Sequence, residues 1–141
     1  MILAVVGSHI LTPEQGKAAW PLVMGLILFH DPMEVVTGDA TGIDSVVREA
    51  AKMCGFREPT EEAPSPQWPL TVYAPGVREW NPPGGNGYMA RNAKIVGRLQ
   101  RGRDKLVRVA KRVNQSTYGS GWTADRAREV LGADDALTYY L

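Results

Sequence analysis

Short apolar runs alternate with amphipathic segments along this chain, a pattern typical of strands that are followed by helices. Ile2–Val6 is continuously apolar and ends at Gly7, which predicts a strand buried on both faces, as in a parallel sheet. Thr12, Pro13 and Gln15 then indicate a helix start, because a threonine cap and a glutamine three residues later satisfy free backbone donors. The apolar positions of that helix recur at helical spacing: Ala19, Leu22, Val23, Leu26 and Ile27.

The same alternation continues to the end of the sequence. Glu34–Thr37 predicts a second strand, and the helix after it ends at Gly55. The apolar positions of this helix are Ile43, Val46, Val47, Ala50, Ala51 and Cys54. Prolines and charges make 57–67 a surface loop and 81–87 an irregular segment of the kind that carries function at a sheet end. The remaining predictions are strands at Trp68–Tyr73, Leu106–Ala110 and Ala136–Leu141, helices at Gly87–Arg101 and Thr123–Leu131, and a glycine turn at Tyr118–Gly121.

We expect these elements to form one α/β domain over residues 1–141, with a mostly parallel sheet of about five strands covered on both faces. Ligands of such sheets bind beyond the carboxyl ends of the strands. Three glycine-bearing loops each follow a predicted strand and should gather at that end: Gly7–His9, Gly38–Gly42 and Gly119–Gly121. The second of them also opens a helix, where free backbone N–H groups attract anions. The sequence therefore predicts a site for a nucleotide-like ligand.

Composition narrows this picture only a little. The chain has 141 residues and a single cysteine, Cys54, so no disulfide can form within it, and its position on an apolar helix stripe predicts packing rather than nucleophilic chemistry. No segment has the pattern of a signal peptide or the length of a membrane span, so we expect a cytoplasmic protein without membrane association. The Gly-X-Gly-X-X-Gly and Walker motifs are absent, which disfavours the ordinary NAD and ATP folds, and neither a cofactor nor a metal site is predicted.

The net charge of +1 hides an uneven distribution, because basic side chains gather between Arg91 and Arg112. Such a cluster is suited to phosphates or nucleic acid, and it is equally compatible with a solvated surface. Helical spacing places one set of basic residues on one face of the predicted helix: Arg91, Lys94, Arg98 and Arg101. The opposite face is then formed by Met89, Ala93, Val96 and Leu99. We interpret Arg98 and Arg101 as a solubilising stripe and Arg91 as a ligand-binding residue.

Two segments carry a resemblance to a known family. Gly38-Asp39-Ala40-Thr41-Gly42-Ile43-Asp44 resembles a Gly-Gly-Ala-Arg-Gly-Ile-Asp signature, and Arg91-Asn92-Ala93-Lys94-Ile95-Val96 resembles an Arg-Asn-X-X-Ile/Met-Val/Ala signature. Both signatures belong to the SLOG superfamily, which includes DNA-processing protein A, the LOG nucleotide hydrolases and small stand-alone YspA-like proteins. Val5–His9 and the segment from Gly119 to Glu129 are similar to two further motifs of the family, so the resemblance spans nearly the whole chain.

The resemblance implies a Rossmann-like fold that binds nucleotides, nucleotide-derived signals or single-stranded DNA, and it implies a homodimer or higher oligomer. It also implies a set of ligand-binding positions: Gly7, Ser8, His9, Gly38, Asp39, Thr41, Gly42, Asp44, Arg91, Asn92, Gly119, Ser120 and Gly121. The chain departs from the family at His9, Asp39, Thr41 and Ser120, where the family has arginine, glycine, arginine and threonine. Two arginines that would face phosphates are thus missing, so the loop is expected to hold its ligand more through backbone and sugar contacts than through charge.

Individual site residues allow more than one interpretation. Arg91 offers a bidentate contact to phosphate from the start of a helix. Asn92 is suited to the loop backbone, to a ribose hydroxyl or to helix capping. Asp44 is suited to a ribose or a base, or simply to the helix dipole, and the role of Asp39 is open. His9 can donate to a phosphate or titrate, although a lone histidine is more often structural.

Four tryptophans complete the candidates. An indole at Trp80 or Trp122 is placed to stack on a base, with loop packing as the alternative. For Trp20 and Trp68 packing is the default interpretation.

Three functions are compatible with this sequence, and we rank ligand binding first because it needs only the loops, Arg91 and a stacking ring. A nucleoside 5′-monophosphate phosphoribohydrolase of the LOG type is second. The resemblance implies an arginine–carboxylate pair for that reaction, with Arg91 as the arginine and Asp125 as the acid in one alignment, whereas the register that the helix spacing favours puts Thr123 there. Single-stranded DNA binding is third, because the loop arginines are missing.

Overall fold

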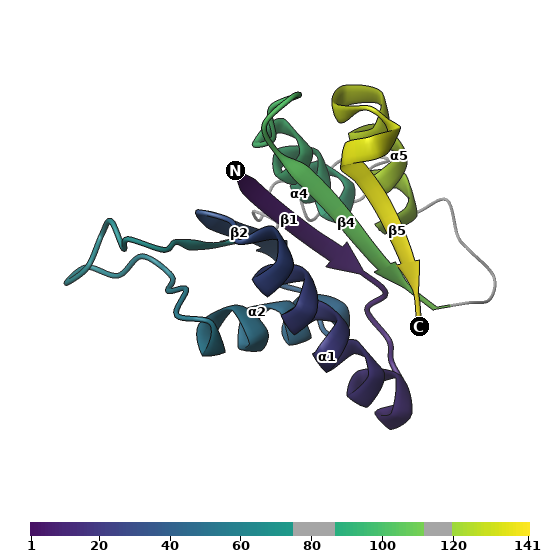
Figure 1. Ribbon diagram of the computed structural model, residues 1–141, viewed down its shortest axis with the longest axis horizontal. Helices are drawn as coiled ribbons and strands as arrows, with labels where there is room; N and C mark the ends of the chain where they lie inside the picture. Colours follow the sequence, from purple (N-terminus) through teal and green to yellow (C-terminus); the bar gives the residue numbers. More distant parts are fainter. Residues whose placement is uncertain (75–86, 112–119) are drawn as a thin grey trace.

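The computed structural model describes residues 1–74, 87–111 and 120–141, with backbone only at 87–89. Five strands and four longer helices alternate along the described chain, confirming the α/β class (Figure 1). The strands are β1 (Ile2–Gly7), β2 (Glu34–Gly38), β3 (Leu70–Tyr73), β4 (Lys105–Ala110) and β5 (Ala136–Tyr140). The helices are α1 (Pro13–His30), α2 (Ile43–Met53), α4 (Gly87–Gly97) and α5 (Ser120–Leu131), and a short 3₁₀ turn spans Ala133–Asp135.

The strands form a single sheet in the order β3-β2-β1-β4-β5, and every neighbouring pair is parallel. The first strand in the sequence is therefore the central strand of the sheet. Its register pairs Ala4 with Val36 on one side and with Leu106 on the other. Because all strands run the same way, their carboxyl ends and the loops that follow them lie along one edge, where α/β sheets bind ligands.

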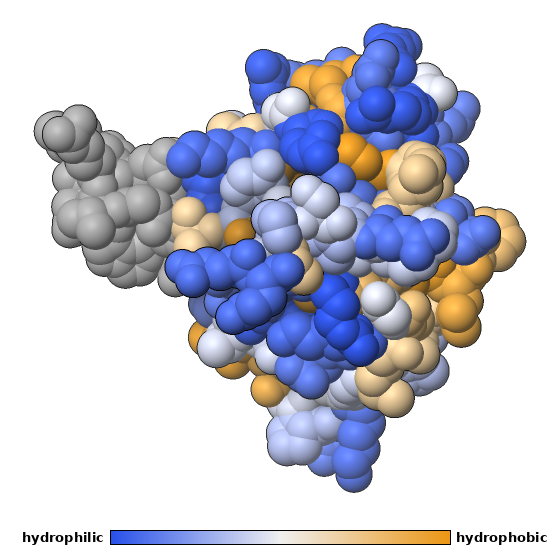
Figure 2. Space-filling model, turned by 90° about the vertical axis from the view of Figure 1, so that its left-hand side faces the viewer, coloured by the Kyte–Doolittle hydropathy of each residue, from blue (hydrophilic) through white to orange (hydrophobic). Residues whose placement is uncertain are grey.

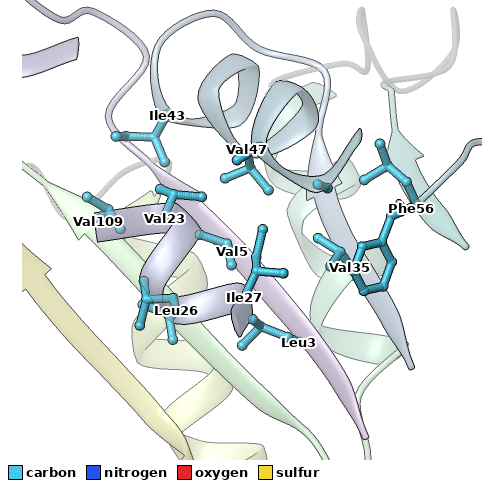
Figure 3. Close-up of a cluster of buried hydrophobic side chains, with 14 of the residues drawn as sticks. Leu3, Val5, Val23, Leu26, Ile27, Val35, Ile43, Val47, Phe56 and Val109 are labelled. Carbon is cyan, nitrogen blue, oxygen red and sulfur yellow. The ribbon is translucent and has the colours of Figure 1, made fainter. Parts of the chain in front are cut away.

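Two separate apolar clusters fill the two faces of the sheet, as expected for a three-layer, Rossmann-like fold. Alternate residues of β1 point to opposite faces. Leu3 and Val5 pack with α1 and α2 in one cluster (Figure 3). Ile2, Ala4 and Val6 pack on α4 and α5 in the other. The strand is therefore continuously apolar because it is buried on both sides.

The ends of the first two helices follow the predicted signals. Thr12 and Gln15 form a complete capping box at the start of α1, with Gln15 N–H donating to Thr12 Oγ1 at 3.2 Å and Thr12 N–H donating to Gln15 Oε1 at 2.9 Å. The second helix, α2, begins directly after Gly42 and is capped by Cys54. Gly55 follows with φ +96°, a conformation that favours glycine and ends the helix.

Two helix boundaries differ from the prediction. Helix α4 ends at Gly97, four residues before Arg101, and the chain turns before β4. Ser120 and Gly121 lie in the first turn of α5 rather than in a loop, so the helix begins three residues before the predicted Thr123. The predicted loop at 57–67 is confirmed, because it contains no helix or strand and only Arg57 forms an isolated bridge. The face turned to the viewer in Figure 2 is mainly hydrophilic.

The predicted faces of this helical segment are wrong for Arg91 and Ala93, whereas Val96 and Leu99 are buried and Lys94, Arg98 and Arg101 are exposed as predicted. Arg91 and Asn92 are buried together with Ile95, Val96 and Leu99, whereas Ala93 is exposed. A simple amphipathic pattern fails here because two polar side chains occupy inward positions and find polar partners there. Met89 has no described side chain, so its assignment to the apolar face lies outside the described residues.

The buried carboxylate of Asp104 lies at the amino end of the sheet. Asp104 is fully buried and accepts hydrogen bonds from the backbone N–H of Ile2 at 2.8 Å and of Gln100 at 2.7 Å. Burial alone would raise the pKa of Asp104, but the hydrogen bonds from Arg103, Ile2 and Gln100 outweigh it and hold the pKa below its usual value. No helix among the described residues is long and apolar enough to cross a membrane.

Candidate functional site

The loops that follow β1 and β2 meet at the carboxyl edge of the sheet. Ile43 N–H donates to the Ser8 carbonyl at 3.0 Å, and Thr41 Oγ1 donates to the His9 carbonyl at 2.8 Å. Gly42 lies between them with φ +74°, and a Cβ there would overlap the backbone of Ser8 and His9. Glycine is therefore required at this crossing, both for its backbone conformation and for the close approach of the two chains.

Strand β4 joins this junction through Ser8. Ser8 N–H donates to the Val109 carbonyl at 3.2 Å, and Ser8 Oγ accepts from Lys111 N–H at 3.1 Å. A Cβ at Gly7 would overlap the Val109 carbonyl and the side chain of Ile43. Gly7 and Ser8 thus hold together the chain ends after β1, β2 and β4. This packing role does not depend on a ligand.

The side chain of Arg91 extends from α4 to the Gly38–Gly42 loop, where it lies beside Gly38 and Asp39. Its Nη1 lies 3.0 Å from Asp39 Oδ1 and 3.7 Å from Asp44 Oδ2, and only 6% of its side chain is exposed. Its Nε donates to Asn92 Oδ1 at 2.8 Å, and Nη1 also approaches the Tyr73 carbonyl at 3.5 Å. The guanidinium that we expected to bind phosphate is therefore buried and held by two carboxylates.

These contacts define the surroundings of Asn92 and Asp39, whose roles the sequence left open. Asn92 lies inside α4 rather than at its start, and its amide oxygen orients the guanidinium of Arg91. Asp39 keeps 39% of its side chain exposed while it pairs with Arg91. One of its carboxylate faces is therefore accessible from solvent at the edge of the sheet, where a hydroxyl donor of a ligand can reach it.

Asp44 is the deepest acid of the site. Desolvation in its buried position raises its pKa to about 6, although Arg91, the backbone N–H of Ala40 and Arg48 each oppose this shift, and Asp39 adds to it. Its Oδ1 is buried without a hydrogen-bond partner among the residues that the structure describes. A buried carboxylate with one unpaired oxygen is costly, and such groups concentrate at functional sites.

One contributor to the site was not predicted. Arg48 donates from Nη1 to the Gly38 carbonyl at 2.9 Å and to the Ala40 carbonyl at 3.0 Å, which fixes the loop from the side of α2. Its position one helical turn after Asp44 is the signal that could have found it. Gly38 was predicted to bind ligand, and in the structure it has a packing role, because a Cβ there would overlap both Arg91 and Asp44.

The residues near the start of α5 are arranged differently from the Arg91 cluster. Arg108 Nε donates to Ser120 Oγ at 3.2 Å, while Gly121 and Thr123 are buried. Asp125, the candidate acid for hydrolysis, is 66% exposed and lies 3.8 Å from Arg128. Arg91 instead contacts Asp39 and Asp44. Gly119 and Trp80 lie outside the described residues.

Three residues of the basic stretch pair with acidic side chains. Arg98 pairs with Glu34 at 2.7 Å, Arg103 with Asp104 at 2.8 Å, and Lys105 with Asp135 at 2.9 Å. Local neutralisation of this kind favours the interpretation of the stretch as an ordinary ion-paired surface over a continuous basic face.

The remaining candidates fill structural positions or the margin of the site. Trp20 packs against the core, and Trp68 lies edge-on to Phe56 with ring centroids 6.4 Å apart. Cys54 is half-buried with its Sγ 3.8 Å from Met24 Sδ, and burial raises the pKa of its thiol, in keeping with a packing role. Trp122 is half-buried in α5, and His9 is exposed beside the loop junction. Within the described part of the chain, no group of three or more metal-ligating side chains gathers.

No protein-family model matches the chain, and no curated protein is similar enough to indicate a relative.

Proposed function

We propose that this protein binds a nucleotide or a nucleotide-derived ligand at the Gly38–Gly42 loop, as a SLOG-like domain. The observation that carries the proposal is the junction of the loops after β1 and β2, beneath which Arg91 is buried against Asp39 and Asp44. A buried arginine paired with two carboxylates costs desolvation energy, and this one lies at the carboxyl edge of a parallel sheet, where α/β proteins bind ligands. Such a cost is typical of a site kept for function.

The charges around the loop favour recognition of a sugar as well as an anion. Asp39 and Asp44 face Arg91, and Arg48 binds the loop carbonyls, so the acidic and basic side chains balance when all are ionised. The exposed carboxylate of Asp39 is suited to accept hydrogen bonds from ribose hydroxyls. Ile43 N–H donates to the Ser8 carbonyl, so the donors for a phosphate are the remaining N–H groups of the first turn of α2, as at helix starts in other nucleotide sites.

The two alternatives rank lower on the same contacts. Hydrolysis of the LOG type needs an acid that works with Arg91, and Asp125 is exposed and paired with Arg128. Binding of single-stranded DNA needs available cations, and Arg98, Arg103 and Lys105 each have an acidic partner. Homo-oligomerisation remains part of the SLOG-like proposal and is tested by the mass of the protein in solution.

A thermal-shift screen tests the proposal. We expect adenosine, nucleoside monophosphates or ADP-ribose to raise the melting temperature by mass action, and a short single-stranded DNA to leave it unchanged. Asp39→Asn should weaken the affinity for a ribose-bearing ligand about tenfold, and so reduce its thermal shift, because the neutral amide is a weaker acceptor for sugar hydroxyls. Glu129→Gln is the matched control, since Glu129 is an exposed acid of α5 that pairs with Arg126.

Three results would contradict this proposal. A response to DNA alone, with a steep dependence on salt, would favour the nucleic-acid function. Release of free base from a monophosphate, lost in Asp125→Ala, would establish the hydrolase. No response to any of the compounds would remove nucleotide binding altogether.

A further inference from the structure

One oxygen of the buried Asp44 carboxylate is positioned to carry a proton. Asp44 is 3% exposed, its Oδ2 faces Arg91 at 3.7 Å, and its Oδ1 has no partner among the described residues. Protonation of Oδ1 would remove the charge of the least solvated acid in the site. The remaining oxygen would still face the guanidinium.

The groups around Asp44 decide how such a proton is controlled. Arg91 faces it from α4, Arg48 lies one turn further along α2, and Asp39 approaches from the loop. The Tyr73 carbonyl of β3 contacts the same guanidinium, and His9 is exposed on the loop after β1. With both aspartates ionised, the two arginines are balanced. A bound anion adds negative charge to this cluster, and a proton on Asp44 would restore the balance.

We propose that Asp44 takes up one proton from solvent when an anionic group of a ligand occupies the Gly38–Gly42 loop, and that Arg91 then exchanges a carboxylate partner for the anion. The proton bonds to Oδ1, and no bond of the ligand breaks. This inference rests on the proposed function and adds its regulation: phosphate-bearing ligands bind more tightly as the pH falls. The raised pKa of Asp44, about 6, places the free protein within reach of this proton near neutral pH.

Calorimetric titration with ADP-ribose tests the coupling, because its diphosphate keeps the same charge across the neutral range. We expect the affinity to fall about tenfold or more between about pH 5.5 and about pH 7.5, in proportion to the loss of protonated Asp44. At the higher pH, titrations in two buffers with different ionisation enthalpies should show uptake of close to one proton per ligand. The uncharged nucleoside adenosine should bind with little dependence on pH.

Asp44→Asn supplies the main comparison, because asparagine has the shape of the protonated acid. Its affinity for ADP-ribose should be nearly independent of pH and close to that of the wild type at the low end of the range. His9→Gln should keep the dependence, since the coupling belongs to Asp44. If the screen identifies AMP rather than ADP-ribose, AMP takes its place, and its own titration cancels in the ratio of wild type to Asp44→Asn.

A measurement on the unmodified protein covers the case in which Asp44→Asn does not fold. The ¹³C chemical shift of the Asp44 carboxyl, followed at about pH 7.5, should move toward its protonated value as ADP-ribose is added. An unmoved carboxyl signal, pH-independent affinity, or a dependence that survives in Asp44→Asn would overturn the coupling and leave the proposed function standing. Failure of every phosphate-bearing ligand to bind at any pH would overturn the proposed function, and the coupling with it.

Discussion

Asp44 and Arg91 show how two single residues concentrate the cost of the site. Each is almost fully buried, and the 3.7 Å between Asp44 Oδ2 and Arg91 Nη1 is longer than a direct hydrogen bond. A pair at this separation does not fully repay the desolvation of both charges. The cost falls on Asp44, whose pKa is raised, and it has a measurable signature in the unfolding free energy of the protein.

We expect the unfolding free energy to decrease as the pH rises from about 4 to about 6, through the contribution of Asp44. In this window the unfolded chain has lost the proton of Asp44, whereas the folded protein still holds it, so a raised folded pKa lowers stability with increasing pH. The difference between Asp44→Asn and the wild type should therefore grow in favour of the variant by about 2–3 kcal/mol across the window.

Urea unfolding of both proteins at several pH values measures this difference. Taking the difference between variant and wild type cancels the contributions of the other acids, including Asp104, whose lowered pKa acts in the opposite sense at lower pH. A constant difference across the window would show that Asp44 titrates near its ordinary value.

At the scale of elements, the loop between β2 and α2 depends on having no side chain at Gly38. Arg48 donates to two carbonyls of this loop, and the backbone N–H of Ala40 donates to Asp44. Arg91 and Asp44 fill the space beside Gly38. Helix and strand are thus joined through buried charges rather than through apolar contact alone. Small changes in volume at this point act on the site directly.

Gly38→Ala should destabilise the protein by about 1–3 kcal/mol, because the new methyl group displaces Arg91 and Asp44 from a packed position. It should also weaken the thermal shift with nucleotides. Gly25→Ala is the matched control: a Cβ at Gly25 in α1 meets open space, so alanine should raise stability by about 0.5–1 kcal/mol. Equal effects of the two substitutions on melting temperature would contradict the packing role of Gly38.

The elements themselves could be predicted because each carries a local signal. The capping box at Thr12, the apolar run of β1 and the glycine after α2 all act over a few residues and fold as expected. The surroundings of Arg91 could not, since its partners Asp39 and Asp44 lie about fifty residues away, and no periodic pattern marks a buried arginine. The position of Arg91 on the exposed face of α4 was predicted wrongly for this reason.

At the scale of the whole molecule, the sheet separates two cores that contact different helices. Ile27 of α1 lies in one cluster and Ile95 of α4 in the other. Both are almost completely buried. The two clusters have no member in common, and mutational effects at sites without shared partners are usually additive.

We expect Ile27→Ala and Ile95→Ala each to cost about 2–5 kcal/mol, because each leaves a cavity in a packed core. The double variant should lose the sum to within about 0.5 kcal/mol. Chemical denaturation of the four proteins measures the cycle. A coupling well above that value would indicate that the sheet transmits packing changes from one face to the other.

The central position of β1 determines when the sheet can form while the chain is being synthesised. One edge of β1 pairs with β2, about thirty residues later, but the other waits for β4, and the Asp104 carboxylate that accepts from Ile2 N–H is 102 residues away. An unpaired edge of a buried strand is a template for wrong partners. A ribosome-bound chain lacking β4 should therefore depend on chaperones, and productive folding should begin only after the segment through Ala110 has left the exit tunnel.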